Sequence, residues 1–363
     1  RYSMTNQIDY GMFIMPFHSP SKPAAQCYDE DLELIVRAED LGFSEFWIGE
    51  HHTMKYENIV LPEAFIGKAL AMTNTIRLGT APTCLPYHHP AYVATRLAFM
   101  DQLSHGRLNL CFGPGSVTSD LELYNIDPKL NSAMAEESAE IILQLWNQEP
   151  PYKINGRFWQ IDLEENVDQD TLIGYIHKPL QKPHPPIFAP GMSMNSSTMK
   201  TAGKKGWAPI SANISPGNVV ADNWRVYEKA ALEAGRVPNR SDWRVCRSIF
   251  IGDNKEETER QVRTNSMGNA FEYIGSLFDQ GLGRKMLKRD PEMSDMDCNL
   301  DYLMQEQMIH GDVDEVVNRL NMFRDETGDF GTLVLMGYDW DDKEAWLHSM
   351  DLFVNEVIPA LNS

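Results

Sequence analysis

The chain has 363 residues, of which 42% are hydrophobic, so it is long enough for one large α/β domain or two ordinary ones with a sizeable core. Its 52 acidic and 32 basic residues give a formal charge of −20, which makes a nucleic-acid backbone or an anionic membrane an unfavourable partner. The five cysteines lie far apart without a CxxC pair, and no continuous apolar stretch approaches 18 residues. We therefore expect a cytoplasmic protein without a membrane span.

Short apolar strands alternate with helical patterns through the first third of the chain. Pro82 cannot donate to a sheet ladder, so Ala81-Pro82 marks a strand end or an irregular junction, with a cis bond as one option. Four strands are expected in this part of the chain: Tyr10–Met15, an apolar run that begins at Phe46, Ile76–Thr83 and Arg107–Phe112. Pro16 ends the first strand, and the apolar run from Phe46 stops at Glu50. The expected helices are Asp29–Leu41, a segment after Pro62, and a segment ending at Met100.

The same alternation continues to the end of the chain. Helices are expected at Ser132–Trp146, at Met199–Lys205, before Gly235, and from Asp312, whose partner Glu315 fits a capping box. Strands are expected at Pro186–Ala189, Trp207–Ile210, Val245–Ile251 and Gly331–Met336, while 152–185 reads as irregular. Eight strands without a linker predict a single α/β domain over 1–363, a (β/α)8 barrel. A doubly wound open sheet is the competing interpretation, and the lack of a complete GxGxxG after the first strand disfavours it.

Residues 255–308 interrupt the alternation after the seventh strand. This insertion is charged, helix-prone and rich in methionine, a flexible side chain that suits irregular apolar surfaces. It is either a mobile lid over the active site or a segment that packs on the barrel.

Polar residues follow several of the expected strands at their C-terminal ends. Glu50, His51 and His52 follow the second strand, and adjacent histidines on an extended segment point to opposite sides, so one of the two faces the cleft. In a (β/α)8 barrel these residues share a rim with Pro82, Gly113–Gly115, Gly191–Ser197 and Ser211. Active sites of this fold lie at that rim.

Two further motifs have a chemical and a structural interpretation. Gly191–Thr198 places glycine, asparagine and three consecutive hydroxyl residues ahead of a helix, which is typical of an anion site, although ordinary N-capping needs only one of them. His88 and His89 lie in a loop, and we interpret His89 as a polar residue without a role. A zinc hydrolase that uses His51 and His88 is an alternative, but the chain has no HxH or HExxH spacing, and we predict no metal site.

These segments together resemble a known family, the bacterial luciferase-like flavin-dependent monooxygenases, across nearly the whole chain. The branch that looks most similar contains limonene 1,2-monooxygenase-like proteins. The segments that carry the resemblance are Gly11–His18, Leu41–Phe43, Trp47–His52, Arg77–Thr80, Leu85–Pro90, Asp101–Leu103, Gly106-Arg107, Gly113–Gly115, Thr118–Asp120 and Ile126–Pro128.

The resemblance implies a two-component monooxygenase. Such an enzyme takes reduced FMN from a separate NAD(P)H:flavin reductase. The reduced FMN reacts with O2 to form a C4a-peroxyflavin, which oxygenates a small hydrophobic substrate such as a terpene, cyclic ketone or aldehyde. A homodimer is also implied. The alternatives are a deazaflavin-dependent oxidoreductase on the same barrel, a non-catalytic flavin-binding protein and, more remotely, a metal-dependent barrel hydrolase.

The resemblance also assigns roles to residues. His51 matches the catalytic imidazole beside the flavin, Glu50 lies near the ring, Ala81-Pro82 matches an unusual peptide bond under the ring, and Gly113 matches a position close to it. The phosphate-binding loop matches Met194, Asn195, Ser196, Ser197 and Thr198. Arginines that some members add are replaced by Pro114 and by Ala133 or Met134, so we expect loosely bound, exchangeable FMN.

Overall fold

The computed structural model describes residues 7–15, 17–281 and 283–363, so the expected strand stop at Pro16 lies outside the described chain. The strands are β1 (Asp9–Ile14), β2 (Glu45–Ile48), β3 (Arg77–Cys84), β4 (Leu108–Gly113), β5 (Tyr152–Asn155), β6 (Gln160–Leu163), β7 (Ile187–Gly191), β8 (Ala208–Ser211), β9 (Arg244–Ile251), β10 (Met308–Gly311) and β11 (Thr332–Met336). All eight expected strands are present, within two residues of the expected bounds where those were given.

Eight of these strands form a closed parallel barrel. Their order around the sheet is β9-β11-β1-β2-β3-β4-β7-β8, and the pairing of Ile210 with Arg244 joins β8 back to β9. β10, which the sequence did not predict, pairs in parallel with the C-terminal half of β9. The predicted (β/α)8 barrel is therefore confirmed.

The helices cover most of the connections between barrel strands. They are α1 (Ala24–Asp40), α2 (Pro62–Leu70), α3 (Pro90–Leu103), α4 (Thr118–Leu123), α5 (Asn131–Asn147), α6 (Ser197–Lys205), α7 (Gly217–Glu233), α8 (Lys255–Thr264), α9 (Ser266–Asp279), α10 (Leu300–Glu306), α11 (Val313–Thr327), α12 (Lys343–Leu352) and α13 (Ile358–Leu361). Asp312 caps α11 by accepting a bond from the Glu315 N–H at 2.9 Å, as the capping pattern predicted. None of the helices in the described part of the chain is long and apolar enough to cross a membrane.

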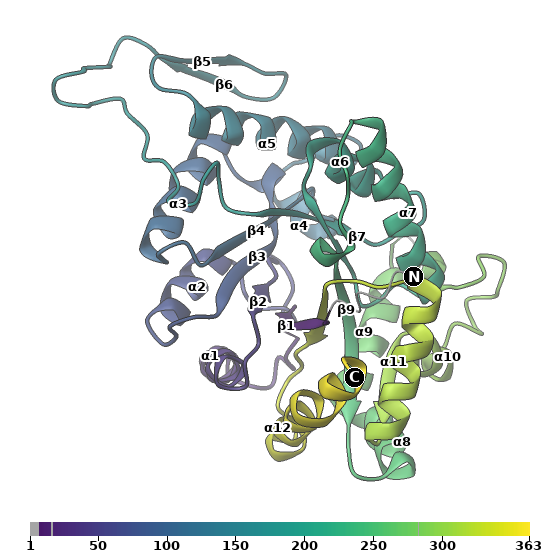
Figure 1. Ribbon diagram of the computed structural model, residues 1–363. Helices are drawn as coiled ribbons and strands as arrows, with labels where there is room; N and C mark the ends of the chain where they lie inside the picture. Colours follow the sequence, from purple (N-terminus) through teal and green to yellow (C-terminus); the bar gives the residue numbers. More distant parts are fainter. Residues whose placement is uncertain (1–6, 16, 282) are drawn as a thin grey trace. The chain divides into compact units, whose positions relative to one another are not determined.

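The chain divides into two compact units (Figure 1). The smaller comprises 48–54 and 59–188, and the larger comprises 1–47, 55–58 and 189–363. The organisation as one domain over 1–363 remains a prediction.

In the smaller unit, the segment 152–185 is not wholly irregular. It begins with an antiparallel hairpin, β5–β6, beside α5 in Figure 1. Its connecting loop donates backbone N–H bonds from Phe158 at 2.8 Å and Trp159 at 3.1 Å to the Glu137 carboxylate of α5. A charged acceptor thus fixes a turn that lies outside the barrel.

In the larger unit, a buried histidine joins the loops that follow β1 and β11. His18 Nε2 lies 2.9 Å from the Asp31 carboxylate of α1, and its Nδ1 lies 2.5 Å from that of Asp339. Burial opposes the charged form of His18, but these hydrogen bonds outweigh it and raise the pKa of His18 to about 9. Lys22, 2.9 Å from Asp339, adds a second cation to the cluster.

The insertion at 255–308 forms α8, α9 and α10 within the larger unit. Met267, Met304 and Met308 are buried in it, whereas Met296 is exposed. The buried methionines favour the interpretation that this part packs on the barrel, and the lid remains a prediction.

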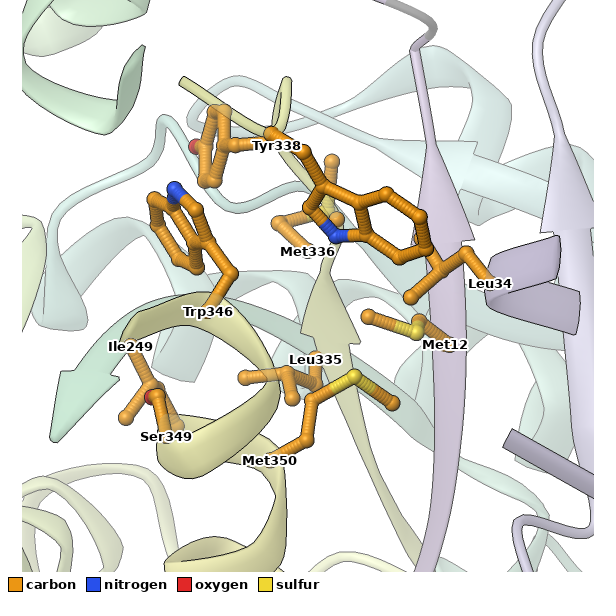
Figure 2. Close-up of a pocket in the computed structure, with 11 residues that line it drawn as sticks. Met12, Leu34, Ile249, Leu335, Met336, Tyr338, Trp346, Ser349 and Met350 are labelled. Carbon is orange, nitrogen blue, oxygen red and sulfur yellow. The ribbon is translucent and has the colours of Figure 1, made fainter. Parts of the chain in front are cut away.

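A small apolar cavity lies in the larger unit between β1, β9 and β11 on one side and α1 and α12 on the other (Figure 2). Met12, Leu335 and Met350 are among its lining residues. Its volume of about 10 Å³ is room for roughly one water molecule. It is too small to hold a flavin or a terpene.

Candidate active site

The polar residues that the sequence analysis named as candidate site residues directly follow the second barrel strand, β2. All four residues of β2 are buried, and the strand ends at Ile48, directly before Gly49, Glu50, His51 and His52. These polar residues thus follow the C-terminal end of a barrel strand, as expected.

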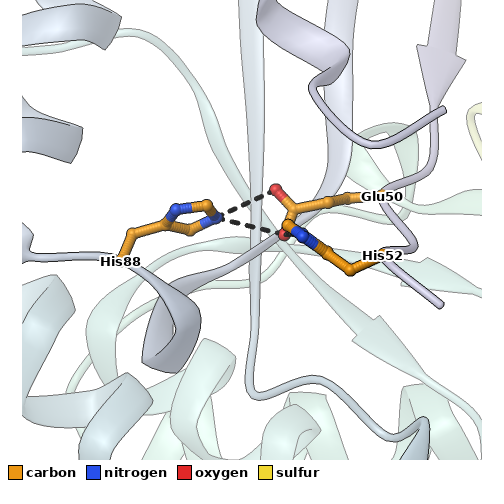
Figure 3. A group of neighbouring side chains, drawn as sticks. All are labelled: Glu50, His52 and His88. Carbon is orange, nitrogen blue, oxygen red and sulfur yellow. Dashed lines mark hydrogen bonds and ion pairs between the residues drawn. The ribbon is translucent and has the colours of Figure 1, made fainter. Parts of the chain in front are cut away.

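Glu50 is 1% exposed and lies between two imidazoles (Figure 3). His88 Nε2 is 3.1 Å from one carboxylate oxygen and 3.2 Å from the other, and His52 Nε2 is 3.2 Å from the second. Burial raises the pKa of Glu50, but the two imidazoles outweigh this effect, and the pKa is lowered overall. Glu50 is therefore a buried anion at neutral pH.

His51 faces a different carboxylate. Its Nδ1 lies 3.9 Å from Asp120 Oδ2, at the start of α4, and its side chain is 12% exposed. Asp120 also accepts bonds from the backbone N–H groups of His52 at 3.2 Å and Thr53 at 2.8 Å. Burial raises the pKa of Asp120, whereas His51 and Thr53 lower it more, so this carboxylate is also ionised. The side chains of the two adjacent histidines thus face different carboxylates, and which of them faces a substrate cleft remains a prediction.

Two tyrosines line the cluster next to His52. The rings of Tyr87 and Tyr124 stack at 5.4 Å, and the His52 ring meets each of them edge-on. Tyr124 Oη lies 2.7 Å from His52 Nδ1. Gly115 has φ +74°, and a Cβ there would lie 2.3 Å from Tyr87 Oη, so this position requires glycine.

The expected ring-contact residues lie on β3 and β4. The Ala81-Pro82 bond is cis, and the register with β4 shifts between Thr80 and Thr83, which confirms an irregular junction. The alternative of a strand end is wrong, because β3 continues to Cys84, where paired residues resume. Gly113 pairs with Cys84, whose Sγ lies 4.0 Å from the Glu50 carbonyl oxygen. Gly113 is therefore a near neighbour of the Glu50 segment.

The predicted phosphate-binding loop, Met194–Thr198, belongs to the larger unit. Ser196 is the N-cap of α6, and its hydroxyl accepts a bond from the Met199 N–H at 3.2 Å. The side chains of Asn195 and Ser197 are exposed ahead of the helix. The capping interpretation is thus confirmed for one hydroxyl, and the phosphate-binding role of the loop remains a prediction.

An arginine that the sequence analysis missed lies beside this loop. Arg225 of α7 donates to Asn195 Oδ1 at 2.9 Å and pairs with Asp222, while the Asn195 N–H donates to Asp222 at 2.7 Å. Its guanidinium is more than half exposed. No local motif marks it, since it is 30 residues from Asn195 and reaches the loop only through the packing of α7 beside α6.

His88 and His89 have different partners, and His89 has a structural role that the sequence analysis did not expect. His89 is exposed and caps α3 by accepting a bond from the Ala91 N–H at 3.2 Å, whereas His88 reaches Glu50. The sequence missed Asp120 and Tyr124 as partners of the two histidines. In the sequence, Asp120 was marked only by its place in Thr118–Asp120, one of the segments that carry the family resemblance, and Tyr124 lies outside these segments.

Comparison with known proteins identifies the family. The model of the luciferase-like monooxygenase family matches residues 8–329. A 4-hydroxyprotoasukamycin monooxygenase from Streptomyces nodosus subsp. asukaensis is 31% identical, over 98% of this chain and 93% of its own. Limonene 1,2-monooxygenase from Rhodococcus erythropolis is 29% identical, over 98% and 87%.

A solved structure agrees over almost the entire chain. It is the oxygenating constituent of 3,6-diketocamphane monooxygenase from Pseudomonas putida, a type II Baeyer-Villiger monooxygenase in complex with FMN. The TM-score is 0.88 at 28% identity, with 97% of this chain and 98% of the other covered. The chain therefore belongs to the luciferase-like monooxygenase family.

Proposed function

We propose that this protein is the oxygenase component of a two-component system, supplied with reduced FMN by a separate NAD(P)H:flavin reductase. Family membership makes the chain a flavin-dependent monooxygenase with FMN as its cofactor. The observation that carries the proposal is the His51–Asp120 pair, a mostly buried imidazole beside an ionised carboxylate after the second barrel strand. The co-substrates of the system are then O2, which is reduced, and a small hydrophobic organic substrate, which receives one of its oxygen atoms.

Each unit, taken by itself, has residues that suit one part of FMN. For the phosphate, the first turn of α6 has backbone N–H groups without an intrahelical acceptor, next to Ser197, Thr198 and the Arg225 guanidinium. Met194, Asn195 and Ser196 complete that loop. For the ring, we assign Glu50, Ala81, Pro82 and Gly113, where the side chains are small or buried.

His51 is the proposed catalytic residue. Bound reduced FMN supplies the two electrons that activate O2. An imidazole is the side chain that exchanges a proton most readily near neutrality, so His51 can hold or release the proton that this chemistry requires. Asp120 is a positioning residue, because its charge orients Nδ1 of His51 and its other bonds fix Thr53.

The proposed substrate class rests on two of the three named relatives. These two are named for limonene and for a diketocamphane, a cyclic alkene and a cyclic ketone of terpene origin, whereas the third is named for 4-hydroxyprotoasukamycin. We propose a cyclic terpene or terpenoid ketone as the substrate here. A Baeyer-Villiger insertion beside the carbonyl would then compete with epoxidation of an alkene.

A substrate screen tests the proposal. Purified protein, an unrelated flavin reductase, NADH and FMN are incubated with limonene, camphor-type ketones and long-chain aldehydes, and products are identified by mass spectrometry. We expect an oxygenated product from at least one cyclic terpenoid. Products from aldehydes alone would contradict the substrate class, and no product from any compound would contradict the oxygenase function.

We also propose that the protein forms a homodimer through α3. Tyr92 and Phe99 are each 63% exposed and Leu103 is 52% exposed. The spacings of seven and eleven residues place all three on one stripe of the helix. Exposed aromatic and aliphatic residues that share a face mark an interaction surface rather than a solvated one.

A further inference from the structure

The cluster formed by Glu50, His52 and His88 has the chemistry of a transition-metal site. Two imidazole nitrogens and one carboxylate oxygen all lie within 4.8 Å of one another, and the three side chains converge from two segments (Figure 3). Nitrogen donors favour Zn²⁺, Cu²⁺ and their neighbours over Mg²⁺ and Ca²⁺, which prefer oxygen.

The separations between the imidazole nitrogens and the carboxylate oxygens match those around a shared cation. Zinc lies about 2.0–2.1 Å from imidazole nitrogen and about 2.0–2.2 Å from carboxylate oxygen. When the ligand–zinc–ligand angle lies between a right angle and the tetrahedral value, two ligand atoms are therefore roughly 2.9–3.4 Å apart. The nitrogen–oxygen separations are 3.1 and 3.2 Å for His88 and 3.2 Å for His52.

His52 distinguishes this arrangement from a simple hydrogen-bonded network. Its buried Nε2 makes no hydrogen bond with the described residues, although it is 3.2 Å from the Glu50 carboxylate, because the atoms are not aligned for one. Its Nδ1 is engaged by the Tyr124 hydroxyl at 2.7 Å. An outer partner that holds one ring nitrogen while the other faces a carboxylate is the usual environment of a metal-binding histidine.

We infer that Glu50, His52 and His88 bind one divalent transition-metal cation of the Zn²⁺ class, with Tyr124 orienting His52 from outside. Three protein ligands leave further coordination positions to water. This site shares Glu50 with the residues assigned to the flavin ring, whereas the proposed catalytic pair, His51 and Asp120, takes no part in it.

A pair of identical substitutions at neighbouring positions tests the inference. The full chain, stripped with a chelator, is titrated with Zn²⁺ and Co²⁺ by calorimetry, and bound metal is measured after gel filtration. We expect one equivalent of Zn²⁺ and a visible absorption band from Co²⁺. His88→Asn should weaken binding at least tenfold, whereas His89→Asn, which keeps the capping acceptor of α3, should leave it unchanged.

Two further variants keep the test decisive if His88→Asn fails to fold. Glu50→Gln should abolish the Co²⁺ band, and Tyr124→Phe should weaken Zn²⁺ about tenfold or more, as loss of an outer partner does. Absence of retained metal, or equal retention in the wild type and the Glu50 variant, would overturn the inference. FMN binding, followed by fluorescence on the wild type and on the His88→Asn and Tyr124→Phe variants, reports on the flavin function independently, because neither His88 nor Tyr124 is assigned to the flavin.

Discussion

At the scale of single residues, His51 and His52 are consecutive but have different partners. His51 faces Asp120, while His52 faces Glu50 and Tyr124. The sequence predicted Glu50 and His51 as site residues, because polar residues directly after a buried apolar strand stand out from the pattern of the chain. It did not predict Asp120 or Tyr124, because α4 and the turn after it reach the histidines only through tertiary packing.

Replacing His51 by Ala should uncouple the proposed enzyme. Product formed per NADH consumed should fall by at least about tenfold, since a positioned acid or base contributes about 100-fold or more. Hydrogen peroxide should account for the remaining NADH. Asp120→Asn should have a smaller effect of the same kind, and wild-type coupling in the His51 variant would remove this residue from the mechanism.

At the scale of elements, the first turn of α6 and Arg225 of α7 bear on cofactor affinity. The sequence identified the hydroxyl-rich turn by its composition but not the arginine, which is 30 residues away in the chain. Arg225 is also paired with Asp222, so part of its charge is already neutralised. We therefore retain the prediction of exchangeable FMN.

Arg225→Ala should weaken FMN binding about tenfold or more, the magnitude of one hydrogen bond to a charged group. Riboflavin, which lacks the phosphate, should bind the variant and the wild type equally. Arg236→Ala is a matched control, because Arg236 bonds to the Lys204 carbonyl at the other end of α6. Equal losses for FMN and riboflavin would argue against a phosphate contact, and stoichiometric FMN retained by the wild type through gel filtration would contradict loose binding.

The loops after β1 and β11 are joined by His18, and this makes stability depend on pH. The pKa of His18 is raised from 6.5 to about 9 in the folded protein, so its contribution is fully present below pH 6.5 and is lost as pH rises through 9. Unfolding by urea should show a decrease of at most roughly 3 kcal/mol between these limits. His18→Gln should be less stable at pH 6.5 and lack this pH dependence; an equal dependence in both proteins would contradict the role of His18.

The elements that the sequence failed to predict share a physical cause. β5 and β6 are four-residue strands with alternating polar residues, inside a segment interrupted by proline, and their hairpin is fixed by Glu137 of a distant helix. β10 has only Met308 and Ile309 as apolar residues before His310. The barrel strands were predictable because their residues are mostly apolar and buried, even in β2 and β8, which are also only four residues long.

At the scale of the whole molecule, the exposed stripe of α3 predicts assembly. Phe99→Glu should convert a dimer to a monomer in light scattering coupled to gel filtration, because a buried charge opposes an apolar interface. Val237→Glu replaces an apolar residue that is 91% exposed in the larger unit and serves as the control. A monomeric wild type, or a dimeric Phe99 variant, would contradict an interface on α3.

The barrel and its family were predictable from the sequence because the alternation of strands and helices and the motifs extend over nearly the whole chain. The substrate was not, since many apolar molecules suit the same residue types and no motif distinguishes them. Terpenoid ketones follow only from the named relatives.

The fate of molecular oxygen tests the central claim most directly. With reduced FMN supplied by a reductase and a terpenoid substrate under ¹⁸O2, one labelled atom should appear in each product molecule, and the other should leave as water. The product mass should increase by about two units relative to the same reaction under ordinary O2. Product without label, or hydrogen peroxide as the only reduced oxygen species for every substrate, would contradict a monooxygenase.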